Sequence, residues 1–172
     1  MQYPYYSFSV PVFRAGMVNL LTILDKAIAF AGERKVKDAV ILETRLAVDM
    51  LPFARQVQIA SDNAKGTCAR LAGIAAPVME DSEADLAALK MRCQKTIAFL
   101  DSLTPEQFSE AAERKVALPY FPDSHFLGKE FLPLYGLPNF FFHVVTAYDI
   151  LRHLGVPIGK ADFLGEVPRY NN

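Results

Sequence analysis

Apolar residues recur every three or four positions along four stretches of the chain, a spacing that puts them on one face of an α-helix. The stretches run over residues 7–32, 49–73, 82–100 and 137–155. Three of them end at a glycine, whose freedom to adopt a left-handed backbone conformation favours a helix stop. The pattern therefore predicts four amphipathic helices and an all-α protein.

Residues 114–136 break this helical period just before the last predicted helix. The segment holds three prolines and a short alternation of polar and apolar residues around Val116 and Leu118. We expect two short extended segments that pair as a β-hairpin and cover one mouth of the helical assembly. Four helices with a long crossover before the last one predict a four-helix bundle.

The length of 172 residues is that of one ordinary domain, so the expected domain spans residues 1–172. The formal net charge is −1, and the sequence has no block of basic residues that would attract nucleic acid or an anionic membrane. No apolar run approaches the roughly 20 residues of a membrane helix, and the first residues have no signal-peptide pattern. Cys68 and Cys93 lack a metal-binding spacing and are expected to be buried, reduced thiols. These features favour a soluble cytoplasmic protein.

His143, in the last predicted helix, is the main candidate for chemistry. It lies on the same helical face as Asn139, because residues four apart stack above one another. Two interpretations stay open: His143 faces a cavity as a ligand or general base, or it is a core histidine satisfied by Asn139 and Gln58. Arg55 and Asp62 lie near Gln58 on the second predicted helix, either as polar partners in a pocket or as a solvated flank.

His143 is followed by Leu151-Arg152 and then by Leu154-Gly155 at the end of the last predicted helix. This order resembles the final helix of the DinB/YfiT-like superfamily of bacterial four-helix bundles, in which it follows a His-x-x-x-His pair. Asn139 stands where the first histidine of that pair is expected. Residues 47–58, 137–143 and 155–164 also resemble an uncharacterised branch of the superfamily, which is known as a domain of unknown function. The resemblance implies a DinB-like fold over nearly the whole chain.

The resemblance also implies a metal site, with two ligands on the last helix and a third at or next to Gln58. Gln58 and Asn139 replace histidines there, and amide oxygens are weak ligands for zinc or nickel. We therefore expect a degenerate metal site, no bound cofactor, and at most weak binding of a divalent metal at His143. Superfamily relatives include thiol-dependent transferases and hydrolases. By that resemblance His143 would deprotonate a thiol or water in a bound small molecule, and the substrate-binding residues would be Gln58, Asn139, Asp62 and Arg55.

Phe141, Val145 and Tyr148 form an apolar strip on the opposite face of the last helix from His143. Homodimers are the commonest soluble oligomers, and the resemblance implies a superfamily that is often dimeric. We therefore predict a symmetric homodimer through or near this strip. The alternative to a small-molecule-binding protein is a non-catalytic structural or interaction dimer.

Overall fold

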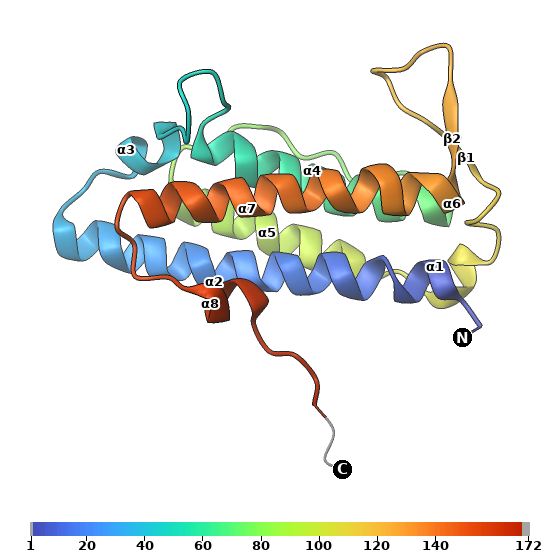
Figure 1. Cartoon of the computed structure of the whole chain (residues 1–172), viewed down its shortest axis with the longest axis horizontal. Helices are drawn as coiled ribbons and strands as arrows, with labels where there is room; N and C mark the ends of the chain where they lie inside the picture. The colour runs from blue at the N-terminus through green and yellow to red at the C-terminus, as the bar shows by residue number, and fades with distance from the viewer. Residues whose placement is uncertain (1, 170–172) are drawn as a thin grey trace.

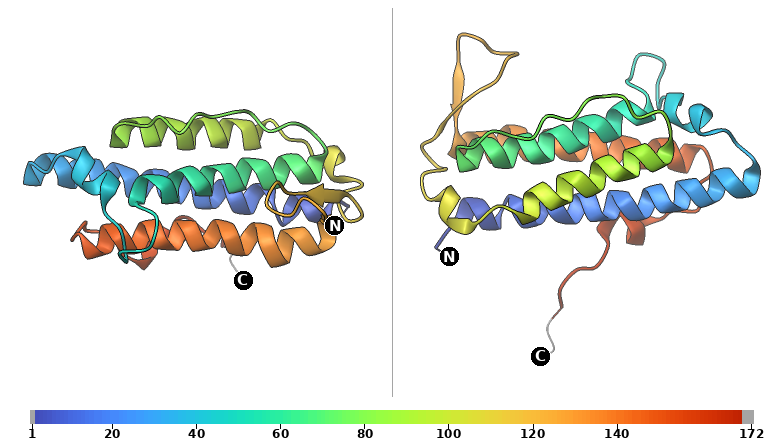
Figure 2. Two further views of the ribbon diagram at one scale, coloured as in Figure 1. Left: turned by 90° about the horizontal axis from the view of Figure 1, so that it is seen from above. Right: turned by 180° about the vertical axis from the view of Figure 1, so that it is seen from behind.

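Four long helices lie side by side in the computed structural model, which describes residues 2–169 (Figure 1). They are α2 (Val10–Arg34), α4 (Phe53–Ala72), α5 (Leu86–Asp101) and α7 (Leu137–His153). The main contacts of α2 are with α5, and those of α4 are with α7 and α5. Figure 2 shows the same bundle from above and from behind. The predicted four-helix bundle is confirmed.

A β-hairpin stands at one end of the bundle, between α5 and α7 in the chain (Figure 1). Its antiparallel strands are β1 (Lys115–Ala117) and β2 (His125–Leu127), with Val116 opposite Phe126. The predicted hairpin before the last helix is therefore confirmed. The other elements are short: α1 (Pro4–Ser7), α3 (Asp38–Glu43), the 3-10 turn η1 (Pro105–Phe108), α6 (Gly128–Phe131), the π-helical turn η2 (Leu132–Gly136) and α8 (Lys160–Leu164).

The last helical stretch begins earlier than the apolar period predicts. α6, η2 and α7 follow one another without a break from Gly128 to His153. Pro133 and Pro138 lie inside this stretch. In a regular α-helix a proline ring collides with the carbonyl group four residues earlier, and a wider π-helical turn relieves such a collision. The hairpin thus leads directly into the helix that carries His143.

The starts of α4 and α5 also differ from the predicted ones. The first residue of α4 is Phe53, four positions beyond the predicted start at residue 49. α5 begins after Asp85, whose side chain accepts a hydrogen bond from the N–H of Ala88 at 2.7 Å. Asp85 therefore caps this helix, three residues beyond the predicted start at residue 82.

Buried apolar side chains from the four long helices form a continuous core. Phe13 of α2 and Phe140 of α7 are fully buried, and their rings meet edge to face with centroids 5.0 Å apart. Cys68 and Cys93 are free and buried in the same core, as predicted. Burial raises the pKa of both thiols, so they stay protonated at neutral pH.

The chain after α7 folds back onto α2 as α8 (Figure 1). Asn19 donates a hydrogen bond to the carbonyl oxygen of Phe163 at 2.9 Å, and Lys26 pairs with Asp162 at 2.7 Å. The Phe163 ring packs edge-on against Tyr148 with centroids 5.9 Å apart. α8 therefore contacts one end of the apolar strip predicted as a dimer interface, while Val145 stays 41% exposed.

The helical stretch from Pro4 to Arg34 is long and apolar enough to cross a membrane by length and composition, with a mean hydropathy of 1.4 in its most apolar window. Within that window, 44% of the residues are buried inside the bundle. Phe13, Met17 and Leu20 are fully buried core residues of this stretch, which accounts for much of its apolar character.

Candidate functional site

His143 lies in the middle of α7, turns toward α4 and is 8% exposed. Its Nδ1 is 2.7 Å from Oε1 of Gln56 on α4. The side-chain nitrogen of Gln56 donates to the carbonyl oxygen of Leu51 at 2.8 Å. Because a carbonyl oxygen only accepts hydrogen bonds, Gln56 must turn its NH2 group to Leu51 and its oxygen to His143. Nδ1 of His143 therefore carries the proton, and Nε2 carries the lone pair.

Nε2 of His143 is the atom left available to a ligand. It makes no hydrogen bond within residues 2–169. Every fully buried side-chain nitrogen or oxygen in this part of the chain has a hydrogen-bond partner, so Nε2 is not fully buried. Nε2 therefore keeps contact with solvent through the small exposed part of the residue. Burial lowers the pKa of His143 below the usual 6.5, because a low-dielectric environment disfavours the imidazolium. The result is a neutral, oriented imidazole with one accessible basic nitrogen.

Gln58 does not meet His143, contrary to the prediction. It accepts a hydrogen bond from Arg55 and donates one to Glu83, both at 2.7 Å. Each residue turns an α-helix by ~100°, so Gln58 points nearly opposite to Gln56. Gln56 is the α4 side chain that reaches the histidine.

Asn139 lies one turn before His143 on α7 and also bonds to an amide of α4. Its Nδ2 donates to Oδ1 of Asn63 at 3.1 Å. The two candidate residues of α7 thus pair with different side chains of α4. Gln56, rather than Asn139, holds the imidazole in its orientation.

The side chains around His143 do not fit a divalent transition metal. Nδ1 is engaged by Gln56, and the partners of His143 and Asn139 are neutral amides, which bind zinc or nickel poorly. Across residues 2–169, no group of three or more His, Cys, Asp or Glu side chains is arranged to hold a metal ion. The polar groups at the His143 site are thus one neutral imidazole and the amides of α4 and α7.

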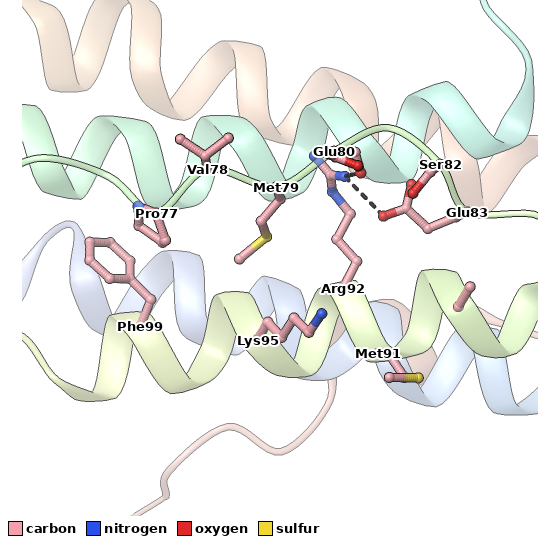
Figure 3. A pocket seen from close by; sticks show the side chains of 11 residues that line it. Pro77, Val78, Met79, Glu80, Ser82, Glu83, Met91, Arg92, Lys95 and Phe99 are labelled. Atoms are coloured by element: carbon pink, nitrogen blue, oxygen red, sulfur yellow. Dashed lines mark hydrogen bonds and ion pairs between the residues drawn. The ribbon is translucent and has the colours of Figure 1, made fainter.

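The other predicted binding residues, Arg55, Gln58 and Asp62, gather instead near Arg92 of α5. The Arg92 side chain is 2% exposed and lies 2.7 Å from a carboxylate oxygen of Asp62. It also lies 2.9 Å from Oε1 of Glu83, in the segment that joins α4 to α5 (Figure 3). We call this segment, residues 74–85, the strap; it contains no helix or strand.

Carboxylates of the strap attach it to both neighbouring helices. Asp81 pairs with Arg92 at 3.1 Å and with Arg55, and Glu83 pairs with Arg92 and accepts from Gln58. The network is balanced in charge, with three cations and three carboxylates: Arg55, Lys65, Arg92, Asp62, Asp81 and Glu83. Burial lowers the pKa of Arg92, but hydrogen bonding and the charges of Glu83 and Asp62 outweigh burial and raise it overall. Arg92 therefore stays charged.

Arg92 was not singled out from the sequence, although a signal was present. It lies three residues after Leu89 and four before Thr96, on the buried stripe of α5. A charged residue on such a stripe is buried only when it is paired. Its partners in the strap could not be named, because the strap has no periodic pattern.

Comparison with solved structures and family models defines the class of this protein. The chain is similar to a crystal structure of a DinB family member from Shewanella denitrificans, with a TM-score of 0.94 and 40% sequence identity, over 99% of this chain and 97% of that chain. The fold is thus that of the DinB-like bacterial four-helix bundles, and the predicted resemblance is confirmed. Residues 5–164 match the family described as Domain of unknown function (DUF1993), and the chain belongs to that family. A comparison with curated proteins finds no significant match.

Proposed function

We propose that the protein binds a small molecule through Nε2 of His143 and needs no metal to do so. One observation carries the proposal: the chain of hydrogen bonds from His143 through Gln56 to Leu51 fixes the tautomer that leaves Nε2 basic. The lowered pKa of His143 keeps this nitrogen unprotonated at neutral pH. An oriented neutral imidazole is the usual requirement for a general base.

The chemistry that follows is the removal of a proton from a thiol or a water molecule. The proton moves to Nε2, which leaves a thiolate or hydroxide and an imidazolium, and the Nδ1–H of that imidazolium continues to donate to Gln56. His143 is only 8% exposed, so a terminal group such as a thiol or water reaches Nε2 more readily than a bulky centre. Thiol transfer and hydrolysis are the reaction classes compatible with this access. Arg55, Gln58 and Asp62 do not take part in this proposal, because their partners lie in the Arg92 network.

A second candidate function is a non-catalytic homodimer formed through α7. It is favoured by the exposure of Phe142 and Val145, which are 55% and 41% exposed in a helix that otherwise packs into the core. Such exposed apolar side chains on one helix suit an isologous interface with a second copy of the chain.

One experiment separates the two functions. We would measure thermal shifts with cysteine, glutathione and Zn²⁺, Ni²⁺ or Mn²⁺ for the wild-type protein, His143→Ala and the matched control His153→Ala, whose residue is exposed at the end of the same helix. Binding at His143 is supported if the thiols raise the melting temperature and the metal ions do not, and if the thiol effect is lost in His143→Ala and kept in His153→Ala. If His143→Ala does not fold, His143→Gln takes its place. A thiol shift that survives both His143 variants ends the first proposal. Silence with all ligands, together with a light-scattering mass of about twice 19.1 kDa, supports the dimer.

A further inference from the structure

A groove lies between the strap and α5 (Figure 3). Seen from above, α5 and α7, the helix of His143, lie on opposite sides of α4 (Figure 2). The volume of the groove is about 610 Å³, within the usual range for pockets that hold small molecules. Strap residues Pro77, Val78 and Met79 form one wall, and Met91, Lys95 and Phe99 of α5 form the other. The groove is thus a second place where the fold can take a ligand, independent of the proposed function.

The α5 wall of the groove has a simple pattern. Met91, Lys95 and Phe99 follow one another at intervals of four residues, so they stack on one face of the helix. Met91 is 56% exposed, and Val78 on the opposite wall is 93% exposed. Exposed thioether and aliphatic groups of this kind adapt to apolar ligands of varied shape.

Charge gives the groove a direction. At one end, Arg92 is saturated by Asp62, Asp81 and Glu83, and it also donates to the carbonyl oxygen of Glu80 at 3.1 Å. At that end Glu83 is paired with Arg92, and the Glu80 side chain adds a further negative charge. This end of the groove is therefore a poor place for an anion.

Lys95 lies in the middle of the groove and Phe99 and Pro77 lie at the other end, away from the acidic residues (Figure 3). The ammonium group of Lys95 makes no ion pair or hydrogen bond within the described residues 2–169. It is a cation without an ion-pair partner among the described residues, and it lies between the apolar end of the groove and the acidic end.

We propose that the groove binds a small amphiphile with one carboxylate, the carboxylate at Lys95 and the apolar body over Met79, Val78 and Phe99. The opposite orientation is less favourable, because it would place the carboxylate beside Glu80 and Glu83, where Arg92 is already paired. The uncommitted Lys95 favours a carboxylate over an uncharged head group, since charge-assisted hydrogen bonds are stronger than neutral ones.

Octanoate and octan-1-ol are suitable probes, because they share a chain and differ in charge. The methyl signals of the five methionines, Met79 and Met91 among them, report binding by NMR in the full-length protein. We expect octanoate to shift Met79 and Met91, and Lys95→Met to weaken its binding about tenfold while leaving octanol binding unchanged. Phe99→Ala should weaken both probes. The matched control is Lys90→Met on the same helix, because Lys90 pairs with Asp25 of α2 outside the groove and should not affect either probe.

Equal affinity of octanoate and octanol for the wild-type protein would overturn the proposal, and so would an unchanged octanoate affinity in Lys95→Met. Shifts of methionines outside the groove, without those of Met79 and Met91, would also overturn it. The His143→Ala variant should bind octanoate like the wild-type protein, so that failure here and failure of the His143 proposal are distinguishable.

Discussion

Replacing Arg92 with methionine is expected to lower the free energy of unfolding by about 3–5 kcal/mol. The Arg92 side chain is 2% exposed and pairs with Asp62, Asp81 and Glu83. Without the guanidinium, Glu83 keeps only the neutral amide of Gln58 as a partner, so its largely buried carboxylate loses its counter-charge, whereas Asp62 and Asp81 keep Lys65 and Arg55. Urea unfolding followed by circular dichroism measures the change, and faster proteolysis within residues 74–85 should accompany it because the strap loses its attachment.

Arg14→Met is the matched control for this substitution. Arg14 also forms an ion pair, at 2.5 Å with Asp101, but both side chains are nearly half exposed. A pair in that position contributes less than about 1 kcal/mol, because solvent screens it. Equal and small losses for Arg92→Met and Arg14→Met would contradict the role assigned to Arg92.

Replacing Gly128 with alanine is expected to destabilise the fold by about 3 kcal/mol. A Cβ atom at Gly128 would lie 1.8 Å from the backbone oxygen of Ala111, far inside contact distance. The backbone there cannot move away easily, because the N–H of Gly128 donates to Arg114 and that of Lys129 donates to Ala112, both at 2.9 Å. The backbone at Gly128, between the hairpin and the helix of His143, therefore packs directly against the backbone at Ala111.

Gly32→Ala is the matched control, and in the same urea unfolding experiment it is expected to stabilise the protein. No atom lies within 4 Å of a Cβ at Gly32, which is in the last turns of α2. Alanine there should stabilise the protein by about 0.5–1 kcal/mol, because it restricts the unfolded chain and favours helix. If Gly128→Ala unfolds at the wild-type urea concentration, the packing described for Gly128 is incorrect.

The sequence predicted most of the fold because helical periodicity and stop signals are local. Gly73, for example, has a φ of 73° and ends α4 as expected. The hairpin followed from the broken period around Val116. The early start of the last helix could not be predicted, since a π-helical turn at Pro133 depends on how the hairpin and the bundle fit together.

The candidate site was predicted less well, for reasons of register and long-range pairing. His143 was found because it is a histidine on an apolar face, but its α4 partner was expected at Gln58 and is Gln56, two residues earlier. Two residues are enough to turn a side chain to the other side of a helix. Arg92 and the strap were missed as a unit, because their ion pairs join segments that have no common pattern.

The central claim, that Gln56 holds His143 as a neutral base with an open Nε2, is tested most directly by ¹⁵N NMR of the His143 ring across a pH titration. The proposal predicts the Nδ1–H tautomer at neutral pH and a pKa below 6.5. In Gln56→Leu, which removes the acceptor, the preference for that tautomer should be lost. An Nε2–H tautomer in the wild-type protein, or a His143 pKa above 6.5, would contradict the claim.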